Sequence, residues 1–430
     1  MHIYFSGIGG TGIGPLALIA HKAGFDVSGS DKQQSLYLEY LAKHDVKDVH
    51  VGQTYEQMAE VHANKPIDWF VYTSALPMEN PDAPELQFCR DNNIKATKRD
   101  DFLNYLLGEK NLKLIAIAGT HGKTTTTAMA IWLFKQLGEP ISFSVGAKMS
   151  FAEMGEFDPA SEYFIYEADE FDRNFLAFSP YLSLIAGIDW DHPDIYPTRE
   201  EYNQAFIQFL GQSQHNILWK EDASLLGAQA SEKITVIDSA DPALGTVTLP
   251  GLVNRQDAFL VAAGISKITG KPMSELIQHL NTFPGVARRF ERIADNIYSD
   301  YAHTPPKIRG ALQLAHEVAG DNVVVVYEGL HNTRQHFIKE ELHDLFGSAK
   351  ELYIVPSYLA REDKALALLS PADLKALMND DIQAHAHASE LNDELASAIK
   401  QHTEAGDLVL CITAGGGGSL DEWLRKNFAA

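Results

Sequence analysis

Cysteine, positive charge and long apolar runs are all scarce in this sequence of 430 residues. Its two cysteines, Cys89 and Cys411, lie in different parts of the chain, so we expect neither a disulfide framework nor a cysteine metal cluster. No apolar run approaches the roughly 18 residues that a membrane-spanning helix needs. The chain begins directly with an apolar strand pattern, without the basic segment and cleavage site of a leader peptide. We therefore predict a cytoplasmic protein.

Lysine and arginine together number 35 against 58 aspartates and glutamates, which gives a net charge of -23 at pH 7. Phosphate-rich surfaces favour proteins with an excess of positive charge, so this balance argues against nucleic acid or a membrane as a partner. A small anionic substrate would require positive charge concentrated at its own site. The sequence therefore favours a globular protein that acts on small molecules.

The length predicts two or three domains, since a single hydrophobic core rarely extends over so many residues. Strand patterns alternate with helical patterns throughout, which indicates an α/β fold. Boundaries are expected near residue 108 and at Pro284-Gly285, so the predicted domains are residues 1–107, 108–285 and 286–430.

The clearest motif follows an apolar strand pattern that ends at Ala118. It reads Gly119-Thr120-His121-Gly122-Lys123-Thr124-Thr125 and leads into an amphipathic helical pattern. Backbone N–H groups of such a loop can bind phosphates, Lys123 can reach the terminal phosphates, and the hydroxyl of Thr124 can bind Mg²⁺. Ala116 replaces one glycine of the full pattern, so a plain glycine turn with a surface lysine is the alternative. We interpret the motif as an ATP site because acidic stretches follow it downstream.

Two acidic stretches come directly after predicted strands. Glu167-Ala168-Asp169-Glu170 follows the strand pattern at 163–166, and the segment 188–194 holds Asp189, Asp191, His192 and Asp194. Because the carboxyl ends of parallel strands meet at one edge of a sheet, we predict that Glu167 and His192 bind a metal ion beside the phosphates. A solvated acidic loop is the alternative for each stretch taken singly.

A second glycine motif, Gly7-Ile8-Gly9-Gly10-Thr11-Gly12, follows the first predicted strand. A second strand pattern ends at Asp31, at about the distance at which dinucleotide-binding folds place an acid. The glycines would let the backbone approach a diphosphate, and Asp31 could accept a hydrogen bond from a ribose or a base. Taken alone, the motif would suggest NAD, and a tight turn without any ligand is the other alternative.

These motifs occur together, and in this order, in the Mur ligase family of ATP-dependent peptidoglycan synthetases, which the chain resembles along almost its whole length. The matching segments are 7–12 with 27–31 for UDP binding, 119–126 for ATP, 167–170 and 188–192 for Mg²⁺, and 289–291 with 300–303 in the third domain. The resemblance implies an N-terminal Rossmann-like domain, a central P-loop ATPase-like domain with a parallel or mixed sheet, and a C-terminal Rossmann-like domain.

The resemblance also implies a reaction. A ligase of this kind joins L-alanine to the lactyl carboxylate of UDP-N-acetylmuramate through an acyl phosphate, in cytoplasmic peptidoglycan precursor synthesis. It would use ATP and Mg²⁺, with two metal ions and Mn²⁺ as a substitute, and would act as a monomer or homodimer without nucleic acid or membrane.

The site residues are carried over by motif. The UDP-sugar residues are Gly7, Gly9, Gly10, Thr11, Gly12, Ser30 and Asp31. The ATP residues are Gly119, Thr120, His121, Gly122, Lys123, Thr124, Thr125, Asn254, Arg289 and Asp300. The metal ligands are Thr124, Glu167 and His192, and the amino-acid residues are Tyr301, His303 and Arg334. The catalytic residues are Lys123, His192, Arg289 and Arg334.

The chain departs from the family pattern in two places. The segment 251–257 keeps only Asn254 of the family's Gly-x-His-Asn-x-x-Asn, and the segment 330–334 keeps only the final arginine of His-Arg-Tyr-(Ser/Thr)-Arg. The second loop is expected to hold the acceptor, so a murein tripeptide, glycine or serine is the alternative to L-alanine. Residues 358–362, in contrast, resemble the alanine-adding branch of the family.

Two other classes of protein fit the motifs less well. A regulatory nucleotide-binding protein would not need the pairing of Glu167 with His192 beside an intact Lys123-Thr124. An NAD-dependent dehydrogenase would explain the first glycine motif but would leave the ATP loop without a role.

Overall fold

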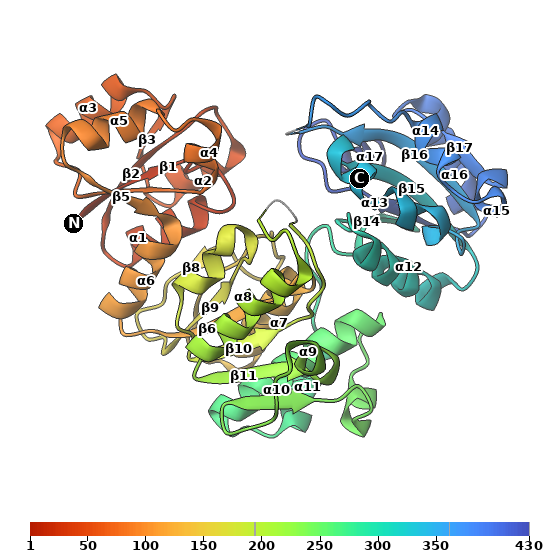
Figure 1. Ribbon diagram of the computed structural model, residues 1–430, viewed down its shortest axis with the longest axis horizontal. Coiled ribbons are helices and arrows are strands. Elements are labelled where there is room, and N and C mark those ends of the chain that lie inside the picture. Colours follow the sequence, from red (N-terminus) through yellow and green to blue (C-terminus); the bar gives the residue numbers. More distant parts are fainter. Residues whose placement is uncertain (193–194, 361, 430) are drawn as a thin grey trace. The chain divides into compact units, whose positions relative to one another are not determined.

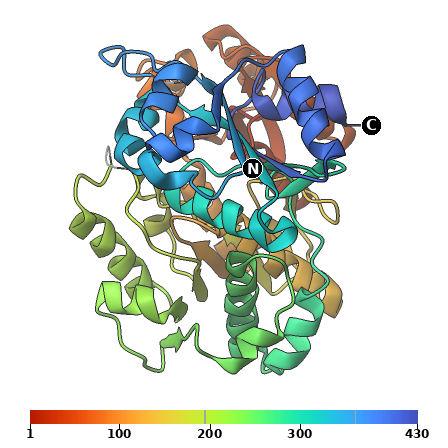
Figure 2. The same ribbon diagram turned by 90° about the vertical axis from the view of Figure 1, so that its right-hand side faces the viewer.

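The computed structural model describes residues 1–192, 195–360 and 362–429. The strands of these residues form three separate sheets, and helices flank each sheet in both views (Figure 1, Figure 2). The prediction of an α/β fold with an N-terminal, a central and a C-terminal α/β part is therefore confirmed.

The first sheet has five parallel strands in the order β3-β2-β1-β4-β5. Its strands are β1 (His2–Ser6), β2 (Asp26–Asp31), β3 (Asp48–Val51), β4 (Trp69–Tyr72) and β5 (Lys95–Lys98). Its helices are α1 (Gly14–Lys22), α2 (Leu36–Lys43), α3 (Tyr55–Asn64), α4 (Ala75–Glu79), α5 (Pro84–Asp91) and α6 (Arg99–Glu109). Every residue of β1 is buried, as expected for the central strand of a sheet covered on both faces. The first glycine motif leaves β1 where the strand order reverses, which is the usual ligand position in such sheets.

The second sheet has seven strands in the order β12-β11-β10-β6-β9-β7-β8, and only β7 and β8 pair antiparallel. Its strands are β6 (Lys113–Ala118), β7 (Ser142–Ser144), β8 (Gly155–Glu156), β9 (Tyr163–Glu167), β10 (Leu182–Ile185), β11 (His215–Trp219) and β12 (Ile234–Ile237). Its helices are α7 (Lys123–Leu137), η1 (Phe171–Ala177), α8 (Arg199–Gln212), α9 (Lys220–Leu226), η2 (Pro242–Thr246), α10 (Leu252–Thr269) and α11 (Met273–Leu280). The ATP motif leaves the carboxyl end of β6, and the two acidic stretches leave its neighbours β9 and β10.

The third sheet has six strands in the order β13-β14-β18-β15-β16-β17, and only β13 and β14 pair antiparallel. Its strands are β13 (Glu291–Ala294), β14 (Ile297–Asp300), β15 (Val323–Leu330), β16 (Glu351–Tyr358), β17 (Ala386–Ala388) and β18 (Leu408–Ile412). Its helices are α12 (Pro305–Ala319), α13 (Asn332–Leu345), α14 (Pro371–Ala376), α15 (Asp380–Ala384), α16 (Asp393–Glu404) and α17 (Leu420–Phe428). All eight residues of β15 are buried, because this apolar run is covered on both faces.

Residue contacts divide the chain into two compact units. One unit comprises Met1–Val247 and Asp257–Phe283 and contains the first two sheets, and the other comprises Thr248–Gln256 and Pro284–Ala430 and contains the third. The first unit has an apolar core in which residues of both sheets take part, for example Phe5 of β1 and Ala116 of β6. The first two sheets can therefore be described as one packed body.

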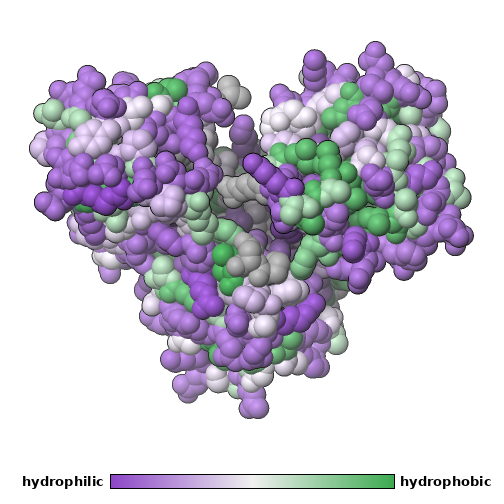
Figure 3. All heavy atoms as spheres, turned by 45° about the horizontal axis from the view of Figure 1, so that its top comes forward, coloured by the Kyte–Doolittle hydropathy of each residue, from purple (hydrophilic) through white to green (hydrophobic). Residues whose placement is uncertain are grey.

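Helix α10 runs on to Thr269, and its buried apolar residues continue to Ile265. Thr304 stands at the N-cap of α12, but its side chain makes no capping hydrogen bond. No helix among the described residues is long and apolar enough to cross a membrane. Hydrophilic residues predominate on the face seen in Figure 3, in keeping with the many charged residues of the sequence.

Candidate active site

The loop after β6 has the geometry of a phosphate-binding turn. Gly119 and Gly122 both have positive φ angles, of 143° and 77°, which glycine adopts without strain. A Cβ atom at Gly119 would lie 2.9 Å from the carbonyl oxygen of Gly187, so the backbone there leaves no room for a side chain. Helix α7 begins directly at Lys123 and runs for 15 residues. The loop therefore presents the positive end of a long helix dipole to an anion.

Thr124 and Glu167 meet beside this loop, as the sequence predicted. The hydroxyl of Thr124 donates a hydrogen bond of 2.8 Å to Oε1 of Glu167, and the backbone N–H of Gly146 donates one of 3.1 Å to Oε2. The pairing of β6 with β9 explains the meeting, because Ile117 and Glu167 are register partners. A hydroxyl and a carboxylate in contact are the hard oxygen donors that Mg²⁺ prefers, so this donor pair fits the ion.

Lys123 is held by a carboxylate that the sequence analysis did not assign. Its ammonium donates hydrogen bonds of 2.6 Å each to Oε2 of Glu170 and to the carbonyl oxygen of Gly119. Burial alone would lower the pKa of Lys123, but the nearby carboxylates of Glu170, Asp169 and Glu167 outweigh this and raise it above its ordinary value. Lys123 therefore stays charged, and its charge is directed at the loop where phosphates would bind.

His192 lies close to Glu170, but the described side chains around it do not form a complete metal-binding site. Its Nε2 atom is 3.8 Å from Oε1 of Glu170 and 3.9 Å from Oδ2 of Asp191. Within residues 1–192, 195–360 and 362–429, no group of three or more His, Cys, Asp or Glu side chains is placed to hold a metal ion. Asp194, named in the same acidic stretch, lies outside the described residues. An ion here would need oxygen atoms from phosphate and water in addition to protein ligands.

Hydrogen bonds connect the second acidic stretch to the loop after β6. The hydroxyl of Thr120 donates to the carbonyl oxygen of Asp189 at 2.5 Å, receives the N–H of Asp189 at 2.8 Å and contacts the hydroxyl of Tyr202 at 2.7 Å. Asp222 of α9 accepts a hydrogen bond of 3.0 Å from the backbone N–H of Ile188. Burial raises the pKa of this carboxyl to about 6, although the bond from Ile188 opposes the shift. Thr120 thus orders the loop rather than presenting a free hydroxyl.

The other two residues predicted to bind ATP here, His121 and Thr125, lie in the loop and at the start of α7. The ring of His121 lies over Gly187, where a Cβ atom would come within 2.2 Å of its Cε1. Thr125 lies half-buried in the first turn of α7. Both remain predicted ATP contacts.

Asp257 was not predicted, although its segment was noted as a departure from the family. It is buried on α10 behind the phosphate loop, and a Cβ atom at Gly122 would lie 2.9 Å from its Oδ1. Its Oδ2 finds no hydrogen-bond partner among the described residues. Burial raises the pKa of this carboxyl well above its ordinary value, which favours the neutral acid.

Asp31 is hydrogen-bonded to the first glycine motif. Oδ2 of Asp31 accepts a hydrogen bond of 2.8 Å from the N–H of Gly9, and a Cβ atom at Gly9 would lie 2.9 Å from the same oxygen. The N–H groups of Gly7 and Ile8 donate to the carbonyl oxygen of Ser30. Of the remaining predicted positions, Gly10 and Thr11 are exposed and Gly12 is half-buried. The carboxylate therefore lies at the loop, where the sequence analysis expected it.

The hydroxyl of Ser30 takes part in a buried hydrogen-bond network next to this motif. Its hydroxyl donates to Glu85 of α5, which also accepts a hydrogen bond of 2.5 Å from Ser6. Ser6 in turn receives the side-chain amide of Gln53 at 2.7 Å. Burial raises the pKa of Glu85, and its hydrogen bonds from the two serines oppose this shift. Glu85 thus links the ends of β1 and β2, and no signal in the sequence identified it.

Four of the residues predicted in the third sheet's unit lie together. The guanidinium carbon of Arg289 is 4.6 Å from the ring centre of Tyr301, and the Tyr301 and His303 rings are 5.4 Å apart. Nδ1 of His303 lies 3.0 Å from the carbonyl oxygen of Tyr301, so Nδ1 carries the proton that makes this bond. Burial, together with the charges of Lys307, Arg334 and Arg289, lowers the pKa of His303 well below its ordinary value. A neutral histidine therefore stands among cations suited to an anionic ligand.

Asp300 and Asn254, predicted to bind ATP, make contacts within the same unit. Asp300 accepts hydrogen bonds of 2.8 Å from the backbone N–H groups of Phe290 and Ala302. The side-chain amide of Asn254 donates to the carbonyl oxygen of Pro250 at 2.9 Å. Arg361, part of the segment that resembles the alanine-adding branch, lies outside the described residues.

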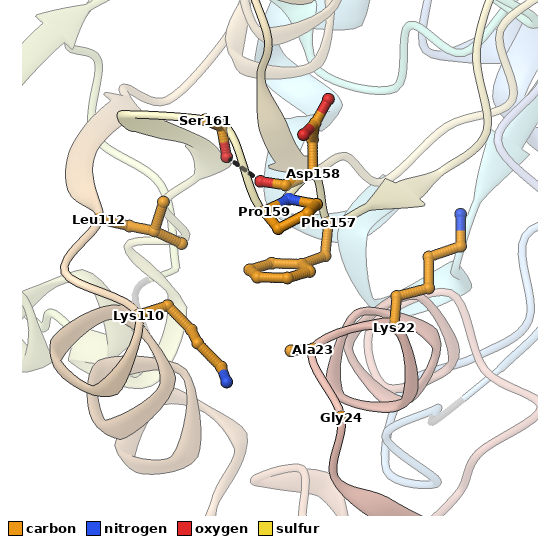
Figure 4. A pocket seen from close by; sticks show the side chains of 9 residues that line it. All are labelled: Lys22, Ala23, Gly24, Lys110, Leu112, Phe157, Asp158, Pro159 and Ser161. Atoms are coloured by element: carbon orange, nitrogen blue, oxygen red, sulfur yellow. Dashed lines mark hydrogen bonds between the residues drawn. The ribbon is translucent and has the colours of Figure 1, made fainter.

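A surface pocket of about 320 Å³ lies in the first unit, apart from both glycine loops (Figure 4). Phe157 projects into it between Lys22 and Lys110, and the hydroxyl of Ser161 donates to the carbonyl oxygen of Asp158 at 2.6 Å. The ammonium of Lys22 is paired with Glu156 at 2.6 Å. None of the predicted site residues lines this pocket, so it has no part in the candidate active site.

Comparison with known proteins points in one direction. Residues 2–111 match the domain described as "Mur ligase family, catalytic domain", residues 117–243 the "Mur ligase middle domain", and residues 288–415 the "Mur ligase, glutamate ligase domain". The chain is 30% identical to the UDP-N-acetylmuramate–L-alanine ligase of a Nocardioides species, over 96% of this chain and 93% of that protein.

Solved structures agree with this. A UDP-N-acetylmuramate–alanine ligase from Thermotoga maritima is 25% identical with a TM-score of 0.75, over 99% of this chain and 98% of that one. A murein peptide ligase from Psychrobacter arcticus is 22% identical with a TM-score of 0.65, over the full length of both chains, and shows the likeness of fold alone.

Proposed function

Because this chain belongs to the Mur ligase family, whose members are ATP-dependent ligases of peptidoglycan synthesis, we propose that it joins L-alanine to the lactyl carboxylate of UDP-N-acetylmuramate. The observation that carries the choice of L-alanine is the full-length similarity to proteins named for that reaction. We infer that the enzyme works in the cytoplasm, as a monomer or homodimer.

The proposed first step is transfer of the terminal phosphoryl group of ATP to the lactyl carboxylate. Both partners are anions, so the site must offset their repulsion. Lys123 would exchange its contact with Glu170 for the terminal phosphates, and the N-terminus of α7 would bind them through backbone N–H groups. Glu170, freed from Lys123, would remain beside His192.

A magnesium ion fits the oxygen donors of Thr124 and Glu167, and we propose His192 as a further ligand. When bound there, the ion would neutralise charge on the phosphates and orient them. We propose that two ions take part and that Mn²⁺ can replace Mg²⁺. The chain's own contribution is to hold Thr124 and Glu167 in contact at 2.8 Å through the pairing of β6 with β9.

The proposed second step is attack by the amine of L-alanine on the acyl phosphate, with release of phosphate. Arg334 would bind the carboxylate of the amino acid, since a guanidinium matches a carboxylate with two parallel hydrogen bonds. His303 stays neutral and Arg289 is stacked on Tyr301, so the positive charge that would attract an anion here comes from the arginines and Lys307 rather than from the histidine. Arg289 and Asp300 would contact ATP.

A murein tripeptide is the alternative acceptor, because the segment 330–334 departs from the family pattern and a carboxylate occupies the helix end beside it. Glu362 accepts hydrogen bonds from the N–H of Thr333 at 2.9 Å and from its hydroxyl at 3.2 Å, at the N-terminus of α13. This carboxylate already occupies the helix end next to Arg334, in the loop that departs from the family pattern. Glycine and serine are smaller changes of acceptor that the same loop would have to distinguish.

Phosphate release from ATP decides between these acceptors. The purified protein is incubated with Mg²⁺, ATP and UDP-N-acetylmuramate, and L-alanine, glycine, L-serine and the murein tripeptide are compared. We expect release that depends strongly on both the UDP-sugar and L-alanine. Release with the tripeptide alone would replace L-alanine by the alternative acceptor, and no release with any acceptor would refute the proposed reaction.

A further inference from the structure

The first glycine motif has no cation of its own. Residues 7–12 contain neither lysine nor arginine, and the only charged side chain hydrogen-bonded to this loop among the described residues is the carboxylate of Asp31. A diphosphate bound there would meet a negative group in a protein whose net charge is -23. A positive side chain supplied by another element would therefore strengthen the binding of a nucleotide diphosphate.

Arg99 is that side chain. It is the first residue of α6, directly after β5, and its Nη1 atom would lie only 2.4 Å from a Cβ atom placed on Gly12. The glycine thus leaves the space that the guanidinium occupies, close to the N-terminus of α1, where Gly14 begins the helix. Its side chain is 19% exposed, so it is partly desolvated yet open to a ligand.

The hydrogen-bonding capacity of Arg99 is not used within the protein. Its Nε is 3.6 Å from Oδ1 of Asp100, and its Nη2 is 4.0 Å from Oδ2 of Asp169. Both distances exceed the usual range of about 2.7–3.2 Å for an N–H···O hydrogen bond. Its guanidinium donates no hydrogen bond to any residue in the described part of the chain. The two carboxylates hold the cation in place by charge and leave its donors for a ligand.

We propose that Arg99 binds the diphosphate of the UDP-sugar over the first glycine motif. The guanidinium is planar and carries five donors, which suits the several oxygens of a diphosphate better than an ammonium does. This inference rests on the proposed function, because it takes the UDP-sugar as the ligand of the first sheet. Asp169 belongs to the acidic stretch beside the ATP loop, so Arg99 also lies between the two substrate sites.

The test compares Arg99→Gln and Arg99→Lys with wild type in calorimetric binding of UDP, UDP-N-acetylmuramate and Mg²⁺–ATP. Loss of a charged hydrogen-bonding partner should weaken UDP and UDP-N-acetylmuramate equally, by about 10- to 100-fold for Arg99→Gln and less for Arg99→Lys. ATP affinity should not change. Arg90→Gln, at an exposed arginine on α5, is the matched control and should bind all three ligands like wild type.

Other results would overturn the inference. A loss confined to UDP-N-acetylmuramate would mean that Arg99 contacts the lactyl carboxylate, and unchanged affinity for both uridine ligands would leave it a purely structural residue. Equal weakening of ATP together with a lowered unfolding temperature would also assign it a structural role. If wild type itself bound neither uridine ligand, the proposed function would fail, and the inference with it.

Gly12→Ala supplies a second, independent test, because a methyl group there would displace the guanidinium. The variant should lose UDP affinity like Arg99→Gln, and the double variant should lose no more than either single one. Additive losses in the double variant would show that Gly12 and Arg99 act separately and would contradict the proposal.

Discussion

The two glycine loops of the first unit share the features that favour anion binding, but the cation beside each loop comes from a different part of the chain. Each follows a buried parallel strand and ends at a helix N-terminus, so each offers backbone N–H groups and a positive helix end. The central loop carries its cation in the next position of the sequence, Lys123. The first loop has no adjacent cation and instead lies beside Arg99, which is 87 positions beyond Gly12 in the numbering. A motif search finds the first kind of cation and misses the second.

The two loops also differ in how their side chains are paired. At the central loop, Lys123 and Thr124 each contact a carboxylate, Glu170 and Glu167, at 2.6 and 2.8 Å. At the first loop, a carboxylate contacts the loop's own N–H, and the nearby arginine donates no hydrogen bond to the described residues. We therefore expect substitutions at the central loop to affect ATP turnover and those at the first loop to affect UDP-sugar binding.

Lys123→Ala should have the largest effect. It removes the charge that we propose stabilises the transferring phosphoryl group and leaves Glu170 buried without its partner, so ATP turnover should fall by at least about 10²–10³-fold. UDP-sugar affinity should stay within about twofold of wild type, as calorimetry can show. Lys113→Ala, at an exposed lysine on the same sheet, is the control and should keep its activity. Loss of UDP-sugar affinity in Lys123→Ala would mean that the roles of the two loops have been assigned wrongly.

Glu167→Gln should act through the metal ion. The amide keeps the shape of the side chain but removes the negative charge of a proposed oxygen ligand, so the Mg²⁺ concentration for half-maximal turnover should rise by about 10- to 100-fold. Turnover should partly recover at high Mg²⁺, which distinguishes a ligand from a structural residue. Glu162→Gln, at an exposed acid just before β9, should show the wild-type Mg²⁺ dependence. An unchanged Mg²⁺ titration would exclude Glu167 as a ligand.

Asp31→Asn should have a smaller effect that is confined to the first loop. The amide can still accept from Gly9 through its oxygen but loses its charge, so a contact to ribose or base hydroxyls and amines should weaken. We expect UDP affinity to fall by about threefold to tenfold, the value of one hydrogen bond, with ATP affinity unchanged. Equal affinity for UDP in the variant and in wild type would restrict Asp31 to ordering the loop.

The sequence predicted well the local structure around residues that stand next to one another in a motif. Strand, loop and helix around Gly119–Thr124 are where the pattern placed them, and Glu167 meets Thr124 because parallel strands end at a common edge. Arg99, Glu85 and Asp257 could not be found in this way. Each reaches its loop from a helix distant in the sequence, and only the folded structure shows which polar side chain is packed against which loop.

Each of the two loops has a buried carboxyl group near it. Glu85 links the strand ends below the first loop, and Asp222 holds the N–H of Ile188 beside the central loop at 3.0 Å. Burial raises the pKa of Asp222 to about 6, from an ordinary value of 3.8. The folded protein therefore binds more protons than the unfolded chain between these two values, and the contribution of Asp222 to stability falls as pH rises through that window.

Asp222→Asn should remove this pH dependence while keeping an oxygen that accepts from Ile188. At pH 7.5 the variant should be more stable than wild type by about 1–3 kcal/mol, and at pH 4 the difference should largely vanish. The free energy of unfolding in urea, measured for both proteins at both pH values, gives this difference directly, and the titration of all other groups cancels in it. Turnover should be unaffected, because Asp222 acts on the loop through a bond that the amide preserves. A variant that is equally stable at both pH values relative to wild type would show that the Asp222 carboxyl titrates at its ordinary pKa, and that water rather than apolar packing surrounds it.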